Sequence, residues 1–181
     1  MERLQALPPK RVIVHPGGFD ARRWQGRHYM KLAQGLAGEG FGVVLTGTAN
    51  EQRHFFQEAS IKEVDAPNIL DLMGQISLRE LMAVIAASNI VVSGSTGPAH
   101  LAAALGVRTV SLFDPRRNQS PTRWKPLGQG IILLPEVPTC EKCIYEACPF
   151  WDCLDRITVD EVLSRVCQVF EKSTPMVMMR V

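Results

Sequence analysis

The sequence predicts an α/β fold, a Rossmann-like doubly wound domain built on a parallel sheet. From Arg11 onward, short runs of Val, Ile and Leu alternate with longer amphipathic stretches, which is the pattern of repeated βα units. The short runs are nearly free of charge, as in strands that helices cover on both faces. Sheets of this kind bind ligands beyond the carboxyl ends of their strands. We therefore expect the site in the loops after the first, second and fourth strands.

The elements follow in order along the chain. The six apolar runs predict strands at 12–14, 43–45, 69–72, 90–92, 109–113 and 131–134. The stretches between and after them predict helices at 25–38, 50–63, 77–88, 97–105 and 159–172. Ser77 with Glu80, and Thr158 with Glu161, read as capping boxes that begin two of these helices. Gly106 stands where a left-handed C-terminal cap favours glycine.

Length and composition limit the class of protein. The chain has 181 residues, of which 46% are hydrophobic and 21% charged, so one globular domain is expected and disorder is disfavoured. Lys and Arg number 20 against 18 Asp and Glu, a net charge of +2 that gives no reason to expect nucleic-acid binding. No apolar stretch approaches the ~20 residues of a membrane span, and the N-terminus lacks the features of a signal peptide. A cytoplasmic protein is expected.

Four segments differ from the domain at 11–172. Residues 1–10 contain Pro8 and Pro9 and look like a linker from a missing N-terminal domain. Residues 115–130 are polar and predict a long loop after the fifth strand. Residues 138–155 are rich in cysteine, and residues 173–181 form a C-terminal tail.

The segment at 93–106 carries the clearest chemical signal. It passes from a strand through small residues directly into an Ala-rich helix. Gly94 and Gly97 permit close approach of a ligand, and Pro98 suits the first helical turn. The N–H groups at such a helix start bind anions, assisted by the helix dipole, so a phosphate site is expected here. His100 lies about one turn into the helix, where its ring would lean back toward the phosphate or bind nothing.

The same segment has a second interpretation, the nucleophile elbow of a hydrolase, with Ser95 between strand and helix. Such hydrolases place their histidine after the serine in the chain. The one histidine after Ser95 is His100, in the helix that Ser95 precedes, from which it cannot act as the base. The hydrolase interpretation is therefore disfavoured.

Two further loops bear on the site. After the first strand, Arg22 and Arg23 are suited to phosphate oxygens, although a basic pair alone is more often only solvated. After the second strand, Glu51 near a helix start either accepts from ribose hydroxyls or favours the helix dipole. The chain contains neither the Gly-x-Gly-x-x-Gly motif of dinucleotide oxidoreductases nor the P-loop motif. Both of those classes are disfavoured.

The ordered series of motifs resembles one known family. It comprises His-Pro-Gly at 15–17, Arg-Arg-Trp at 22–24, Val-Leu-Thr-Gly at 44–47, the stretch 68–81, and Ser-Thr-Gly-Pro-Ala-His within 95–106. Together these are similar to the C-terminal half of glycosyltransferase family 9, the ADP-heptose:lipopolysaccharide heptosyltransferases. The resemblance implies the two-domain GT-B fold, of which this chain looks like the nucleotide-sugar-binding half.

The resemblance also implies a set of diphosphate-binding residues. Thr96, Gly97 and His100 would hold the diphosphate, Arg22 would replace the family's usual lysine, and Gly18 would line the phosphate loop. Arg23 is not part of that resemblance and is expected beside Arg22 from its charge alone.

For the nucleoside, the resemblance implies that Glu51 meets the ribose and that Ile76 packs against adenine. Ser95 belongs to the same set but departs from the family, which usually has aspartate at this position. The departure removes one anion near the diphosphate and puts the identity of the donor in question.

The implied reaction is an inverting transfer from an ADP-sugar to a lipopolysaccharide core or other saccharide, with no required cofactor. The family's catalytic base is an aspartate of the N-terminal domain and has no counterpart here. The residues present would stabilise the leaving group only. The partners implied are the nucleotide sugar and a saccharide acceptor, with peripheral association at the inner membrane. A free-standing nucleoside-diphosphate-binding module with a regulatory role is the alternative.

The cysteines allow more than one interpretation. Cys140, Cys143, Cys148 and Cys153 are spaced so that they would bind zinc or an iron–sulfur cluster, or would form disulfides. Separate thiols without a shared partner are equally compatible with the spacing. Cys167, in the last helix, is expected in the core. A metal-dependent interaction module built on 140–153 is the third and weakest functional hypothesis.

Overall fold

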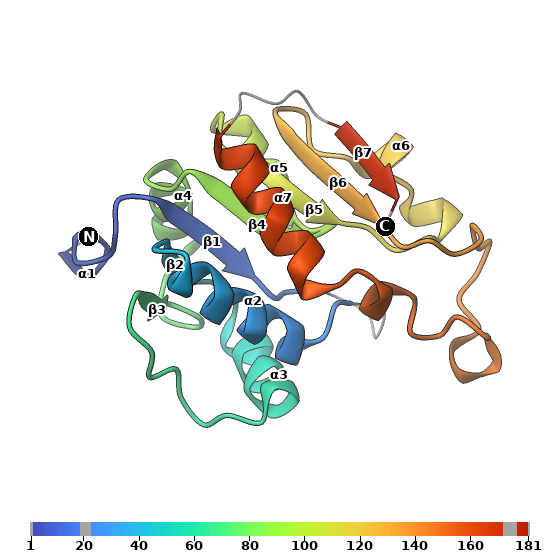
Figure 1. The fold of residues 1–181 in the computed structure, drawn as a ribbon, viewed down its shortest axis with the longest axis horizontal. Coiled ribbons are helices and arrows are strands. Elements are labelled where there is room, and N and C mark those ends of the chain that lie inside the picture. Colours follow the sequence, from blue (N-terminus) through green and yellow to red (C-terminus); the bar gives the residue numbers. More distant parts are fainter. Residues whose placement is uncertain (1, 19–22, 172–176, 181) are drawn as a thin grey trace.

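A computed structural model describes residues 2–18, 23–171 and 177–180. Its described strands form one parallel sheet in the order β3-β2-β1-β4-β5-β6-β7 (Figure 1). Their bounds are β1 Arg11–His15, β2 Gly42–Leu45, β3 Ile69–Asp71, β4 Ile90–Gly94, β5 Arg108–Leu112, β6 Gly130–Leu134 and β7 Val177–Arg180. The six predicted strands are confirmed, and so is the Rossmann-like α/β class.

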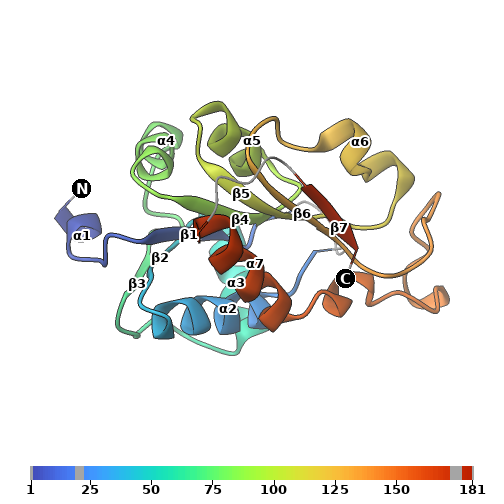
Figure 2. The ribbon, with the colours of Figure 1, turned by 45° about the horizontal axis from the view of Figure 1, so that its top comes forward.

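The helices cover both faces of the sheet (Figure 2). Helices α2 (Gly26–Gly38), α3 (Ala49–Ala59) and α7 (Val159–Glu171) lie on one face, and α4 (Leu78–Ala86) and α5 (Gly97–Ala104) lie on the other. The remaining helical segments are α1 Glu2–Gln5, α6 Pro121–Trp124 and the 3₁₀ turns Arg117–Gln119, Tyr145–Ala147 and Cys153–Arg156. All five predicted helices are confirmed to within a few residues.

The alternation of side chains along each strand explains the two-sided core. Val12 and Val14 of β1 pack in the cluster that contains Leu36 of α2 and Val166 of α7. Ile13, between them, packs in the opposite cluster with residues of α4 and α5. Because successive strand side chains point to opposite faces, a strand buried on both faces must be apolar at every position. That is the pattern from which the strands were predicted.

Local capping fixes the ends of several helices. Ser77 and Glu80 form the expected capping box of α4, with the Ser77 N–H donating to Glu80 Oε2 at 2.7 Å. Gly106 has a φ of +73° just beyond α5, the left-handed conformation expected there. Thr158 Oγ1 accepts from the Glu161 N–H at 3.2 Å at the start of α7.

The first ten residues, expected to be a linker, are partly ordered against the domain. Residues Glu2–Gln5 form α1, and Leu4 is buried in the cluster that contains Ile13 and Val91. Leu4 and Leu7 are two isolated apolar residues ahead of Pro8 and Pro9, too few to show a periodicity that would predict packing. Whether these residues lead from a further domain stays a prediction.

Two other elements were not expected from the sequence. Strand β7 lies beside β6 at the sheet edge, within the segment taken as the C-terminal tail. Helix α6 lies inside the 115–130 segment that was expected to be a loop. Both are four residues long, and elements this short carry too little periodicity to be recognised from sequence.

The strand order indicates the edge of the sheet at which a ligand would bind. Strand β1 pairs with β2 on one side and with β4 on the other, so the chain direction across the sheet reverses between β1 and β4. Ligands of doubly wound sheets bind in the crevice at that point, outside the carboxyl ends of the strands. In Figure 1 the loops after β1 and β4, and the Cys-rich segment 138–155, lie at this edge.

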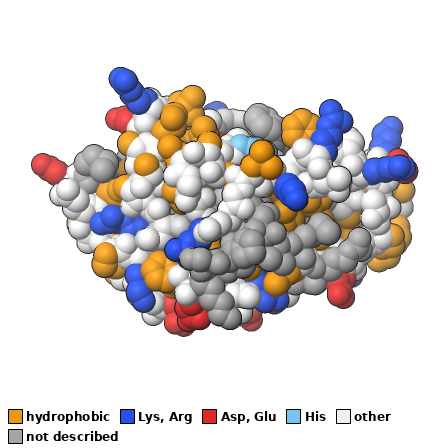
Figure 3. Space-filling model, turned by 90° about the horizontal axis from the view of Figure 1, so that it is seen from above, with side chains coloured by type: hydrophobic (Ala, Val, Ile, Leu, Met, Phe, Trp, Pro, Cys, Tyr) orange, Lys and Arg blue, Asp and Glu red, His pale blue; other side chains and the backbone are white. Residues whose placement is uncertain are grey.

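Charges of both signs are present on the face of the molecule that Figure 3 shows. On the face in Figure 3, Lys and Arg side chains are interspersed with Asp and Glu rather than gathered by sign. This agrees with the net charge of +2 and leaves anion binding to local sites. None of the helices that the structure describes is long and apolar enough to cross a bilayer.

Candidate functional site

Two adjoining cavities open at the carboxyl edge of the sheet. The larger, which we call the large cavity, has a volume of about 560 Å³ and lies between the loops after β1, β2, β3 and β4. The second, which we call the middle cavity, has a volume of about 240 Å³ and lies between the loops after β1, β4 and β5. Gly18 and Thr96 line both, so the two cavities share a wall.

The site residues expected from the sequence divide between these cavities. Glu51, Ile76 and Gly97 line the large cavity, together with the shared Gly18 and Thr96. Two further expected residues, Arg23 and Ser95, line the middle cavity. Arg22 lies outside the described residues. His100 is exposed in the first turns of α5 and lines neither cavity.

The N-terminus of α5, the end of a helix that favours anions, lies at the wall shared by the two cavities. Helix α5 begins at Gly97, after a short turn from β4. Its N-cap Thr96 makes no side-chain capping hydrogen bond among the described residues, whereas Thr48 and Ser77 cap α3 and α4 with complete capping boxes. The N–H groups and the dipole at such a helix start favour negative charge.

A buried histidine lies beneath the large cavity. His15, at the end of β1, is only 6% exposed, and its Nδ1 lies 3.1 Å from Thr46 Oγ1. Burial lowers the pKa of His15, although the carboxylate of Glu51, 4.0 Å from Nε2, opposes that change. The imidazole is therefore neutral near pH 7. A Cβ at Gly17 would overlap both side chains, which explains why this turn needs glycine.

Glu51 has a structural task as well as a place in the site. Its Oε2 accepts a hydrogen bond from the Thr48 N–H at 2.7 Å, and its own N–H donates to Thr48 Oγ1 at 3.2 Å. This capping box begins α3. The helix-start interpretation of Glu51 is thus confirmed, while contact with a ribose stays a prediction that would use Oε1.

Arg23, which was expected to supply a positive charge to the site, already forms an ion pair within the domain. Its guanidinium forms an ion pair with Glu58 of α3, and the other oxygen of Glu58 accepts from the Gly26 N–H at 2.6 Å. This pairing ties the loop after β1 to α3. A role for Arg23 at a diphosphate stays a prediction, and any such role would share its charge with Glu58.

The middle cavity contains charged residues that sequence analysis did not select. Asp114 follows β5 and is 9% exposed, and Arg116 binds it through Nε–Oδ1 at 3.0 Å and Nη2–Oδ2 at 2.6 Å. Both line the middle cavity. The signal available was their position after a strand end, at the start of the polar segment 115–130.

Two aromatic side chains, Trp24 and Tyr29, form part of the wall of the middle cavity. Trp24 is buried and donates from Nε1 to the carbonyl of Ile157 at 2.9 Å. Tyr29 packs edge-on against Trp24 with ring centroids 4.9 Å apart. Burial raises the pKa of Tyr29, more than a hydrogen bond with the Gly94 backbone lowers it, so its hydroxyl stays protonated.

The cysteine segment contributes a separate small cavity. Cys140, Cys143, Cys148 and Cys153 all line a space of about 10 Å³ that Asp114 and Arg116 also border. Backbone N–H groups of Tyr145 and Phe150 donate to the sulfurs of Cys143 and Cys148 at 3.4 and 3.3 Å. Across the described part of the chain, no three His, Cys, Asp or Glu side chains are arranged to hold a metal ion. Cys167 is partly buried and packs against the core cluster of α7, as expected.

Known proteins resemble this chain in both sequence and structure. The profile of glycosyltransferase family 9 (heptosyltransferase) matches residues 2–152. Lipooligosaccharide heptosyltransferase 2 of Haemophilus influenzae is 32% identical over 139 residues, which are 74% of this chain and 39% of the relative. Lipopolysaccharide heptosyltransferase 2 of Salmonella typhimurium is 33% identical over 109 residues, 60% of this chain and 30% of the relative.

Solved structures show the same fold. The ADP-heptose lipopolysaccharide heptosyltransferase II of Escherichia coli superimposes with a TM-score of 0.70 at 25% identity, covering 91% of this chain and 47% of that one. The Escherichia coli heptosyltransferase WaaC with ADP gives a TM-score of 0.68 at 21% identity, covering 90% and 45%. The chain thus spans about half the length of these structures and about a third of the two relatives matched by sequence.

Proposed function

Since the chain belongs to glycosyltransferase family 9, we propose that it is the donor-binding part of a transferase that moves a heptose or related sugar from an ADP-sugar. The observation that carries the proposal is the pair of cavities meeting at the N-terminus of α5. One cavity has the size and walls for a nucleoside, and the helix start beside it suits a diphosphate.

The large cavity is the proposed nucleoside site. Ile76, Leu81 and Pro98 supply apolar walls against which a planar base would pack. Glu51 Oε1 would accept a hydrogen bond from a ribose hydroxyl, while Oε2 keeps its bond to the Thr48 N–H. The His15 ring beside Glu51 is neutral and therefore adds no positive charge to this end of the site.

The diphosphate is proposed to lie over the shared wall. Gly18 comes from the loop after β1, Thr96 comes from the loop after β4, and Gly97 begins the helix whose N–H groups would face the ligand. Arg22, Arg23 and His100 are further proposed contributors. Small residues at 17, 18, 94 and 97 let the phosphate oxygens approach the backbone closely.

The proposed chemistry is an inverting transfer. A base removes the proton from the acceptor hydroxyl, the hydroxyl oxygen attacks the anomeric carbon, and the bond to the diphosphate breaks. Negative charge grows on the departing diphosphate, where the α5 N-terminus would stabilise it. No residue of this chain is assigned as the base. We propose that the base and the acceptor site belong to another domain.

The proposed acceptor is a sugar of a lipopolysaccharide core or a related saccharide. An acceptor of this kind is anchored in a membrane, so peripheral association at the inner membrane face, on the cytoplasmic side, would follow from the acceptor.

A metal has no part in the proposed reaction. The four thiols of the cysteine segment are of the right chemical type for zinc or iron, but the described side chains are not positioned as a ligand set. We therefore assign no step to a metal.

Calorimetry with ADP, UDP and GDP tests the proposed function. We expect ADP to bind most tightly, and Thr96→Asp to weaken its binding by about tenfold or more, because the new carboxylate lies at the phosphate position. Asp is also a favourable N-cap, so the variant should be no less stable than the wild type. Thr158→Asp is the matched control, since it adds the same charge at the N-terminus of α7, away from both cavities.

Three results would contradict the proposal. One is the absence of binding of all three nucleotides to the wild-type chain. Another is equal ADP affinity in the wild type and in Thr96→Asp. An equal loss in Thr158→Asp would show that overall charge, rather than the α5 site, governs binding.

A further inference from the structure

A third cavity adjoins the middle cavity. This outer cavity has a volume of about 130 Å³ and lies between the loop after β1 and the segment 145–155. It shares Arg23 and Leu154 with the middle cavity, just as the middle cavity shares Gly18 and Thr96 with the large one. The outer cavity therefore adjoins the middle cavity, which borders the proposed diphosphate position.

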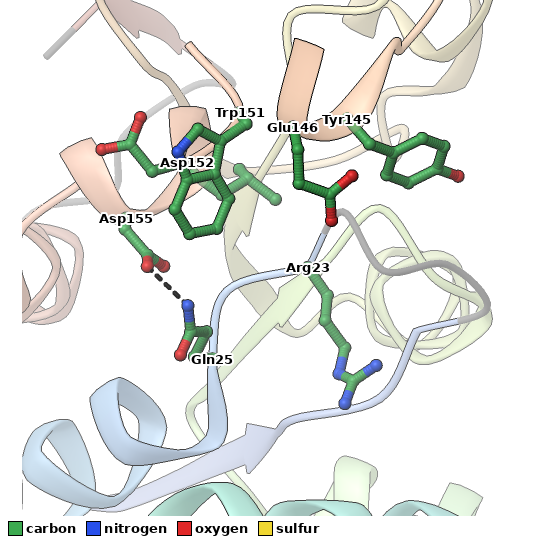
Figure 4. A pocket seen from close by; sticks show the side chains of 8 residues that line it. Arg23, Gln25, Tyr145, Glu146, Trp151, Asp152 and Asp155 are labelled. Carbon is green, nitrogen blue, oxygen red and sulfur yellow. Dashed lines mark hydrogen bonds between the residues drawn. The ribbon is translucent and has the colours of Figure 1, made fainter. Parts of the chain in front are cut away.

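The walls of the outer cavity are aromatic and polar. In Figure 4, Trp151 and Glu146 extend from the Cys-rich segment toward Arg23 and Gln25 on the facing loop, and Tyr145 lies at the rim. Trp151 is 56% exposed and Tyr145 is 43% exposed. Tyr145 also has a φ of +48°, a conformation that bulky residues rarely adopt. Packing within the domain does not account for an indole ring held open to solvent beside carboxylates.

The charges around this cavity disfavour an anion. Arg23 is ion-paired with Glu58, so its positive charge is largely compensated. Asp155 accepts from Gln25 Nε2 at 2.7 Å and from Arg27 Nη2 at 3.2 Å. Glu146 has no hydrogen-bond or ion-pair partner among the described residues, and its carboxylate can accept from hydroxyl donors.

We propose that the outer cavity binds a neutral sugar ring. The apolar face of the ring would stack on the Trp151 indole, which combines apolar area with a polar edge, and ring hydroxyls would donate to Glu146. This inference rests on the proposed function, because a sugar is expected beside the diphosphate only if the chain takes part in a reaction of a nucleotide sugar. Two sources share this chemistry: the sugar of the nucleotide-sugar donor, and a neutral sugar of the acceptor.

The test compares ligands that differ only in the sugar. Calorimetry measures ADP and ADP-heptose on the wild type, Trp151→Ala and Trp124→Ala. In a second arm, the NMR signals of the tryptophan indole N–H groups are recorded while the protein is titrated with methyl glycosides of neutral hexoses and with methyl glucuronide. Trp124 is the matched control, because it is 41% exposed and lies on α6, outside all three cavities. Glu146→Gln gives a second variant that leaves the aromatic ring in place.

Two outcomes support the proposal and name the source. A donor sugar makes ADP-heptose bind about 3- to 10-fold more tightly than ADP, an advantage lost in Trp151→Ala and kept in Trp124→Ala. An acceptor sugar leaves the two nucleotide affinities equal, while neutral glycosides shift the Trp151 signal in the wild type and less in Glu146→Gln.

The opposite pattern overturns it: Trp151→Ala leaves the ratio of ADP-heptose to ADP affinity unchanged and neutral glycosides do not move the Trp151 signal. Glucuronide binding as tight as that of neutral glycosides also contradicts it. Binding of ADP to the wild type is measured in the same experiment, so failure of the proposed function would be seen separately.

Discussion

Individual buried polar side chains tie the site to the stability of the domain. His15 is held between Thr46 and Glu51 directly beneath the large cavity. Its pKa lies below the ordinary value of 6.5 because burial disfavours the charged ring. The folded protein therefore binds this proton less readily than the unfolded chain, and the free energy of unfolding must fall as the pH drops below about 6.5.

This gives a prediction for His15→Gln. The variant should lose less stability than the wild type between about pH 7 and pH 5, because it removes a group that protonates preferentially in the unfolded state. Urea unfolding at the two pH values measures the difference. His28, whose pKa burial also lowers, accounts for part of the remaining loss. Exposed His54→Gln is the control, and an acid sensitivity unchanged in His15→Gln would contradict the linkage.

Residue identity alone did not separate structural from functional roles. Glu51 satisfies a helix-start signal and lines the large cavity at once, and Arg23 lines two cavities while paired with Glu58. Sequence spacing predicted that both residues lie near the site. It did not predict their partners, because Glu58 is 35 residues from Arg23 and meets it only through the packing of α2 and α3.

At the scale of elements, one buried hydrogen bond joins the loop after β1 to the segment before α7. Trp24 donates from Nε1 to the carbonyl of Ile157, and both residues are buried. The bond fixes the end of the Cys-rich segment against α2, which holds Leu154 at the wall between the middle and outer cavities. Leaving a buried carbonyl without its donor is costly because no water replaces the donor.

Trp24→Phe should therefore reduce the free energy of unfolding by about 1–2 kcal/mol beyond the effect of the smaller ring. Trp124→Phe removes a similar bond, from Nε1 to the Asn118 carbonyl at 2.8 Å, at an exposed position, and should cost less than about 0.5 kcal/mol. Urea denaturation of both variants gives the comparison. Equal losses would mean that burial of the Ile157 carbonyl has no energetic consequence.

At the scale of the whole molecule, the described strands form one parallel sheet, and three adjoining cavities lie among the loops that follow its strands. It spans about half the length of the solved relatives. The described residues assigned to the site would bind and polarise a donor, and none is assigned as a base.

We therefore expect the purified chain to bind ADP and ADP-heptose and to transfer no sugar to a lipopolysaccharide core acceptor. The physical reason is that leaving-group stabilisation alone does not remove the proton from the attacking hydroxyl. Incubation with labelled ADP-heptose and acceptor, followed by chromatography, measures transfer. Turnover by this chain without any other protein would show that the base lies within it.

The sequence by itself determined the α/β class, strands β1 to β6, the five longer helices and the family. Each of these depends on local information: apolar runs, capping residues, and small residues at strand ends. The short elements α1, α6 and β7 escaped because four residues contain too little periodicity.

The tertiary structure alone decided which loops meet. The parallel sheet brings strand ends far apart in sequence to one edge, so Gly18 and Thr96 share a wall and Trp151 faces Gln25. Such contacts depend on strand order and on the burial of both sheet faces. No pattern along the chain encodes them, because they follow from where the hydrophobic core forces each strand to end.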